Sequence, residues 1–165
     1  MSKICIVAAI SDNNIIGLKN DMPWFMTNHA KRFRDLTIKS PVIMGKGTQN
    51  MFSFPFDQRV NIVICDDKND VIDGFVHTKS IEQALTLAKT YNTPNIFIIG
   101  GENIFTQYLP FADVLYFTEI YADIKGDKVF PELNVNLWNI ESRIDFEPDA
   151  NNQYPYAFVK YTRKI

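Results

Sequence analysis

Short β-rich runs alternate with helical patterns between residues 4 and 121 of this 165-residue chain. Turn residues bound the runs that we predict to be strands, at residues 4–10, 41–44, 60–64, 75–77, 95–99 and 114–121. Helical patterns fall between them, at residues 27–38, 47–52, 80–90 and 102–108. This strand–helix–strand alternation predicts an α/β fold with a mostly parallel sheet and helices on both faces.

The C-terminal part follows a different pattern. Residues 138–146 and 154–161 alternate in polarity and are joined by the turn-rich segment EPDANNQ. Two such runs predict an antiparallel hairpin, which would place an antiparallel C-terminal edge strand on the parallel sheet. No linker or repeat interrupts the sequence, so we expect residues 1–165 to form a single domain.

Composition excludes several classes of protein. Apolar residues make up 46% of the chain and charged residues 22%, with a net charge of −2 and no basic stripe, so nucleic acid is not expected as a partner. Apolar runs are too short to span a membrane, and no signal peptide is recognisable. Cys5 and Cys65 each lie in a strand-like run without nearby ligand residues. We interpret them as reduced core residues of a cytoplasmic protein and expect no metal site.

Two strand-to-helix junctions contain glycines that would let backbone approach a ligand. Gly100-Gly101 precedes one helix, and Gly45-Lys46-Gly47-Thr48 precedes another. Either junction alone fits a simple tight turn equally well. At the carboxyl ends of parallel strands, however, two such junctions can hold a dinucleotide. No GxGxxG motif follows the first strand, which argues against a Rossmann domain proper.

Other candidate residues each have an ordinary structural explanation. Met26, Ala30, Phe33 and Thr37 share one helix face and fit a core-facing stripe. His29 lies at the margin of that face, where a histidine is more often a satisfied, partly buried residue than a catalyst. Arg59 fits a surface cation and Thr118 a strand former with a locally bonded hydroxyl. Taken together, however, the order and spacing of these residues along the chain favour a functional role over the structural one.

The chain resembles the dihydrofolate reductase family over essentially its full length. The matching pieces occur in the family's order and spacing: IVAAI at 6–10, IIGLKNDMPW at 15–24, Phe33, SPVIMGKGT at 40–48, Arg59, IFIIGGENIF at 96–105 and LYFTEIYADIKGDKVFP at 115–131. The resemblance implies an eight-stranded sheet with about four flanking helices. It also implies a monomer that uses NADPH to reduce 7,8-dihydrofolate, with hydride added at C6 and a proton at N5, and that binds antifolate inhibitors.

The resemblance assigns roles position by position. It assigns catalytic roles to residues around the reacting rings: Met22, Trp24, His29 and Thr118. It gives substrate binding to the walls and the end of one pocket: Val7, Ala8, His29, Ala30, Phe33, Phe52, Phe56, Arg59, Ile99 and Thr118. It gives cofactor binding to a loop and the strand ends: Ala9, Ile16, Gly17, Leu18, Asn20, Asp21, Gly45, Lys46, Gly47, Thr48, Cys65, Asp66, Lys79, Gly100, Gly101, Glu102, Asn103, Ile104 and Phe105. Arg59 would take the α-carboxylate of the substrate's tail, and Gly100-Gly101 would be a cis peptide.

His29 departs from the family pattern, because it occupies the position of an acid that grips the pteridine ring. A carboxylate accepts from both the ring N3–H and the 2-amino group, whereas neutral imidazole offers one acceptor and its cation none. We therefore expect low turnover, with His29 becoming a repulsive cation near its reference pKa of about 6.5.

A second departure concerns the cofactor's 2′-phosphate, where Cys65-Asp66 follows a strand and Lys46 provides a cation. An acidic residue at a strand end recognises a free ribose hydroxyl in NAD sites, so NADH is an alternative to NADPH. Two other functions remain open. One is a reductase of the same fold acting on another pterin or a pyrimidine, and the other is a folate- or nucleotide-binding protein without turnover.

Overall fold

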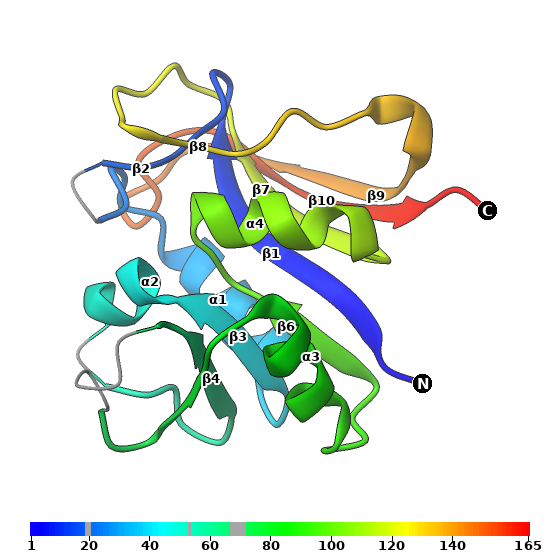
Figure 1. Cartoon of the computed structure of the whole chain (residues 1–165). Coiled ribbons are helices and arrows are strands. Elements are labelled where there is room, and N and C mark those ends of the chain that lie inside the picture. Colours follow the sequence, from blue (N-terminus) through cyan, green and yellow to red (C-terminus); the bar gives the residue numbers. More distant parts are fainter. Residues whose placement is uncertain (19–20, 53, 67–71) are drawn as a thin grey trace.

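The computed structural model describes residues 1–18, 21–52, 54–66 and 72–165. Within these residues a central sheet has eight strands in the order β5-β4-β3-β6-β1-β7-β10-β9 (Figure 1). These strands are β1 (Lys3–Ser11), β3 (Pro41–Gly45), β4 (Val60–Ile64), β5 (Phe75–Thr78), β6 (Asn95–Ile98), β7 (Val114–Ile120), β9 (Trp138–Phe146) and β10 (Tyr156–Arg163). The predicted sheet is confirmed, and most strand ends lie within one or two residues of the prediction.

Strand pairing is parallel from β5 to β7 and antiparallel at the C-terminal edge. β1 pairs in parallel with β6 and β7, whereas β10 runs antiparallel to both β7 and β9. The predicted hairpin is therefore present, with β10 inserted next to β7 and β9 at the edge. Because β1 lies near the middle with helices over both faces, eight of its nine residues are buried, as expected for a central parallel strand.

The helices cover opposite faces of the sheet. In Figure 1, α3 (Ile81–Lys89) and α4 (Glu102–Tyr108) lie in front of the sheet and α1 (Thr27–Thr37) lies behind it. Alternate residues of β1 divide accordingly: Ile6 packs in the cluster with α3 and α4, and Val7 packs in the cluster with α1. The short helix α2 (Lys46–Met51) follows directly from β3. No helix among the described residues is both long and apolar enough to cross a membrane.

Local sequence explains where α3 begins. The hydroxyl of Ser80 accepts a hydrogen bond from the Gln83 amide at 3.0 Å, and the Gln83 side chain accepts one from the Lys79 amide at 2.7 Å. These reciprocal bonds satisfy amides that the first helical turn leaves unpaired. The helix therefore starts after Ser80, its N-cap, where the helical pattern was predicted to begin.

Other features were not predicted. A second sheet pairs β2 (Ile15–Gly17) with β8 (Lys128–Val129), and single 3-10 turns occur at η1 (Leu109–Phe111) and η2 (Val135–Leu137). The prediction for the cysteines was half right. Both thiols are free and Cys5 is fully buried, but Cys65 is only half-buried because it follows the end of β4.

Gly126 lets β8 approach β2 closely, since a Cβ atom there would lie 2.3 Å from Ile15 Cγ2 and 2.6 Å from the Gly17 carbonyl oxygen. We expect Gly126→Ala to lower the free energy of unfolding by about 1–3 kcal/mol, because the small sheet must open to admit the methyl group. Urea unfolding measures the loss. Gly47→Ala is the matched control for stability, because nothing lies within 4 Å of a Cβ there. Equal stability of the two variants would contradict this packing argument.

Candidate active site

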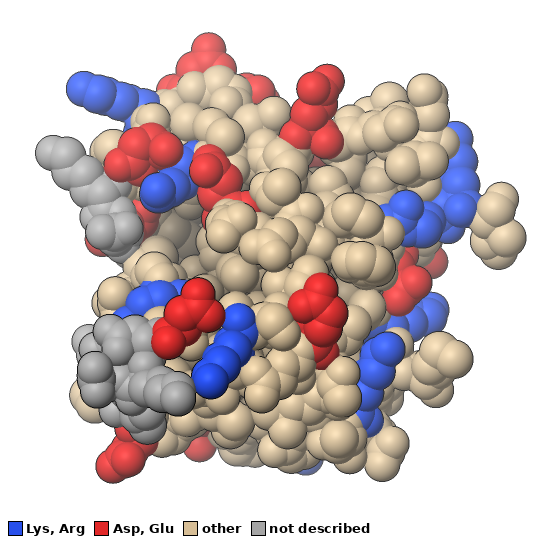
Figure 2. Space-filling model, in the orientation of Figure 1, with Lys and Arg blue, Asp and Glu red and all other residues tan. Residues whose placement is uncertain are grey.

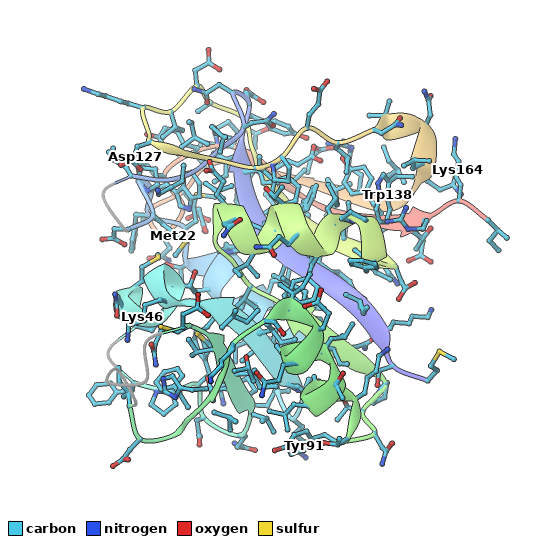
Figure 3. All side chains as sticks on the ribbon, in the orientation of Figure 1. Met22, Lys46, Tyr91, Asp127, Trp138 and Lys164 are labelled. Carbon is cyan, nitrogen blue, oxygen red and sulfur yellow. The ribbon has the colours of Figure 1, made fainter. Side chains whose placement is uncertain are left out.

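A cleft of about 1090 Å³ opens at the carboxyl ends of β1, β3, β4 and β6. In Figure 2 the molecule is hollowed on the left, between the parts that Figure 1 labels β2 and α2, with acidic and basic side chains beside the hollow. Figure 3 shows Met22 on the upper side of this opening and Lys46 on the lower side. Ligands of open α/β sheets bind at this end of the strands.

The cleft has two halves with different chemistry. The α1 half is lined by residues of β1, α1, the end of α2 and the loops beside these elements and after β6: Val7, Ala8, Trp24, Met26, His29, Ala30, Phe33, Arg34, Met51, Phe52, Phe56, Arg59 and Ile99. Phe33 and Phe52 each contact Phe56, with ring centroids 5.2 and 4.8 Å apart. Tilted aromatic rings and aliphatic side chains make an apolar slot that suits a flat ring.

His29 is the polar side chain at the inner end of the α1 half. Its Nδ1 lies 2.8 Å from Oγ1 of Thr118, which is fully buried on β7. Burial lowers the pKa of His29 to about 4, and the Arg32 cation adds to this decrease. The expectation that His29 becomes a cation near pH 6.5 is therefore wrong. At neutral pH the imidazole is uncharged, since protonation would place a charge in a poorly hydrated site.

Trp24 also lines the α1 half, and its indole Nε1 is buried with no hydrogen-bond partner among the described residues. A buried donor without a partner is uncommon in proteins, so a ligand or a water molecule is the expected partner. Met22 is 37% exposed and lines the mouth. Trp24 therefore contributes a buried donor and Met22 a flexible apolar side chain at the mouth.

Arg59 closes the other end of the α1 half on a braced loop. Its Nε donates to the Asp57 carbonyl at 2.8 Å and its Nη1 to the Thr37 hydroxyl at 3.1 Å. Buried Asn61 holds the loop by bonding both backbone groups of Phe56 and the carbonyl of Arg59. No carboxylate pairs with Arg59 in the described part of the chain. Thr37 lies eight positions after His29 in α1, which corresponds to a rise of about 12 Å along the helix.

The α4 half is built around glycines. Gly100-Gly101 is a cis peptide, as the resemblance implied, and Gly100 has φ of +123°. A Cβ on Gly100 would lie 3.3 Å from Thr48 Oγ1, and one on Gly45 would lie 3.0 Å from Ile104. Side chains at these positions would narrow the space between α2 and α4. The absence of Cβ atoms therefore leaves backbone accessible to a ligand that follows the strand ends.

Charges of both signs surround the α4 half. Its acidic lining residues are Asp21, Asp66, Glu82 and Glu102, and its basic ones are Lys46, Lys79 and Lys128. Glu102 Oε1 accepts from the Val129 amide at 2.7 Å, which joins α4 to β8. Lys46 Nζ donates to Gln49 Oε1 at 3.0 Å. The α1 half, in contrast, has arginines and no carboxylate among its described lining residues.

The structure brings nearly all assigned residues together in this cleft. Among described residues, Leu18 and Thr118 are the two assigned positions that do not line it. Leu18 instead pairs its backbone with Asp21, so its binding role is not supported by the geometry. Thr118 lies behind His29 and reaches the cleft through that imidazole. Asn20 lies outside the described residues.

Two contributors were missed because they act from a distance in the sequence. Asn152, in the loop between β9 and β10, accepts from the Asn28 amide at 3.0 Å and caps α1, whose own N-cap residue, Met26, makes no side-chain cap. Arg32 Nη1 donates to the Phe117 carbonyl at 2.7 Å, and its guanidinium lies 4.5 Å from the Phe158 ring centroid. Both fix the helix that carries His29. The sequence offers no local signal for either contact.

Several further lining residues were also not predicted: Met26, Arg34, Met51, Ile64, Ser80, Ile81, Glu82, Gln107 and Lys128. Ser80–Glu82 had a usable signal, since a helical pattern was predicted to begin at residue 80. A helix that follows a parallel strand begins at the carboxyl edge of the sheet, where the cleft lies.

An open, mostly parallel sheet with glycine junctions beside a long two-part cleft is the arrangement of α/β proteins that bind a dinucleotide and a second ligand. A family model described as dihydrofolate reductase matches residues 3–163. Relatives named dihydrofolate reductase include that of Haemophilus influenzae, 36% identical over 96% of this chain and 98% of the relative. That of Bacillus subtilis is 31% identical over 98% of this chain and 95% of the relative.

The solved structures agree. A dihydrofolate reductase from Enterococcus faecalis, in complex with NADP(H) and the ligand RAB-propyl, superimposes with a TM-score of 0.92. It is 27% identical and the match covers 99% of this chain and 97% of that one. The chain belongs to the dihydrofolate reductase family.

Proposed function

We propose that this protein reduces 7,8-dihydrofolate to tetrahydrofolate with NADPH. The observation that carries the proposal is the continuous cleft, in which an apolar slot between His29 and Arg59 meets a glycine-lined channel. A neutral imidazole at one end of the slot and the Arg59 cation at the other suit a flat ring with an anionic tail. The Enterococcus relative's complex with NADP(H) and an inhibitor supports a nicotinamide cofactor and antifolate binding here as well.

The cofactor's fit rests on the residues of the α4 half. Gly100, Gly101 and Thr48 would hold the pyrophosphate against the backbone, and Lys46 would supply a cation. When bound, the nicotinamide supplies the hydride for C6 of the substrate. Ile16 and Met22 line the mouth and would limit water there, which strengthens electrostatic interactions inside the cleft.

Protonation at N5 needs a proton source other than His29. With a pKa of about 4, the imidazole carries no extra proton at neutral pH. We infer that a water molecule passes a proton from bulk solvent to N5 and is reprotonated from solvent, with the unpartnered Nε1–H of Trp24 donating a hydrogen bond that holds it. His29 would orient the ring through one hydrogen bond, and Thr118 would orient His29.

Steady-state oxidation of NADPH with dihydrofolate tests the proposal, followed by NADH with the same substrate. Slow but measurable turnover with NADPH is the expected outcome. Binding of dihydrofolate without any turnover would favour the function of a binding protein. His29 favours one other candidate, a reductase for a different pterin or a pyrimidine, and turnover of such a ring in place of dihydrofolate would identify it.

Asp66 is exposed at the end of β4 and lines the α4 half. We expect Asp66→Ser to raise NADPH affinity severalfold and to lower NADH affinity, because the carboxylate repels a 2′-phosphate but accepts a hydrogen bond from a free ribose hydroxyl group. Cofactor titration measures both affinities. Asp73→Ser is the control, since Asp73 is exposed and outside the cleft. An equal gain for both cofactors would show that Asp66 does not face the 2′ position.

We further propose that residues 1–165 act as one domain and as a cytoplasmic monomer. The two free cysteines support the proposed cytoplasmic location, because disulfides are rare in the reducing environment of the cytoplasm.

A further inference from the structure

The two nitrogens of His29 have different surroundings. Nδ1 lies 2.8 Å from the Thr118 hydroxyl, and because that nitrogen is engaged, Nε2 is the one left for a ligand in the cleft. Thr118 is fully buried, and its hydroxyl has no other hydrogen-bond partner among the described residues. Which of the two groups donates in this single bond therefore decides whether Nε2 offers a ligand an N–H or a lone pair.

Thr118 must donate in this bond if its proton is to be satisfied. A buried hydroxyl proton without an acceptor costs free energy, and Nδ1 is the acceptor within reach. A nitrogen that accepts carries no proton, so the proton of the neutral ring lies on Nε2. The inner end of the slot thus presents an N–H donor.

The charges near this end of the slot agree with a donor site. The cation of Arg32 is fixed three residues along α1, between the Phe117 carbonyl and the Phe158 ring. Arg34 and Arg59 lie in the same half, whose described lining residues include no carboxylate. A ring edge rich in hydrogen-bond donors finds no anion here, whereas a carbonyl oxygen finds the His29 N–H.

We propose that Thr118 is a positioning residue that fixes His29 as its Nε2–H form, and that this donor makes the slot favour a pteridine edge carrying a carbonyl oxygen over one carrying an amino group. The inference rests on the proposed reduction of a pteridine and names the ring edge that the same site selects. Dihydrofolate has an amino group at C2. A counterpart has a carbonyl oxygen at C2. The preference for this counterpart over the C2-amino ring should be greater at the native site than at a site with a carboxylate at position 29.

Binding measurements with these two ligands test the selectivity. Dissociation constants for both are measured by quenching of tryptophan fluorescence, in the native protein and in His29→Asp. The ratio of the C2-amino to the C2-oxygen dissociation constant should be at least tenfold higher in the native protein than in the variant. An unchanged ratio would overturn the inference. His29→Asn, which keeps a neutral polar side chain but lacks the imidazole Nε2–H, should give an intermediate ratio.

The tautomer is measured directly by nitrogen NMR on protein labelled in histidine. The chain has two histidines, so loss of one signal set in His77→Gln assigns the other to His29. In the native protein Nδ1 should have the shift of an unprotonated nitrogen and Nε2 that of an N–H. Thr118→Val should give a mixture of tautomers, and Thr118→Ser should restore the single form. A merely structural role for Thr118 would not change the tautomer.

The outcomes separate this inference from the proposed function. An Nδ1–H form in the native protein would overturn the inference, whatever the enzyme turns over. Absence of NADPH oxidation with dihydrofolate would contradict the proposed function, while the tautomer and the binding ratio still decide the inference. Failure of both ligands to bind the native protein would count against both.

Discussion

Replacing His29 with Asp should raise kcat/KM for dihydrofolate at least tenfold, which corresponds to about 1.4 kcal/mol of barrier. The Asp carboxylate would accept from the substrate's donors and stay charged while N5 takes up its proton, so it stabilises the transition state. The surroundings suit an anion. Thr118 can donate to it, and the nearby Arg32 cation favours the ionised carboxylate, which offsets the burial that is the main cause of the low pKa of His29.

His29→Asn is the matched control, because it has the size of Asp without the charge and should show no such gain. Steady-state rates with NADPH between pH 5 and 8 give the comparison. The native rate should show no step from His29 in this range, because its pKa lies near 4. An equal gain in both variants would mean that shape, not charge, limits the native enzyme. A loss of rate in His29→Asp would favour the reductase for a different ring.

The sheet could be predicted because its strands and helices have local signals. β4 and β9 match their predicted bounds, since turn residues flank both runs. β2 and β8 could not be predicted in the same way. They have three and two residues, and Gly126 lets these distant segments approach closely. Pairing of this kind depends on the folded chain and leaves little periodicity in the sequence.

The site was predicted as a set of positions, but the properties of its residues were not. The resemblance placed His29 in the slot, yet the reference pKa misjudged its charge because burial beside Arg32 depends on how α1 packs on β7 and β10. Asn152 caps the same helix from the far end of the chain. Such contacts join residues more than eighty positions apart, so no local pattern indicates them.

Arg59→Leu should weaken dihydrofolate binding by about 1.5–3 kcal/mol, roughly 10- to 150-fold, and leave NADPH binding unchanged. Arg59 is held in place before any ligand arrives. Its Nη1 donates to Thr37, and its guanidinium lies 5.1 Å from the Phe56 ring centroid. Little side-chain entropy remains to be lost when a carboxylate pairs with the free edge, so the contact contributes most of its energy to binding.

Burial, and next the nearby Arg34 cation, lower the pKa of Arg59, although Asp57 opposes the shift. The Arg34 cation, which disfavours the charged form of Arg59, also attracts an anionic tail. Arg34→Leu therefore serves as the matched control. Arg34 is exposed, and its loss should cost less than tenfold. A dihydropteridine without the tail supplies the other comparison, since Arg59→Leu should not change its binding. Two results would show that Arg59 does not bind the carboxylate. One is an equal loss of dihydrofolate affinity in Arg59→Leu and Arg34→Leu, and the other is an equal loss of affinity in Arg59→Leu for dihydrofolate and for the dihydropteridine without the tail.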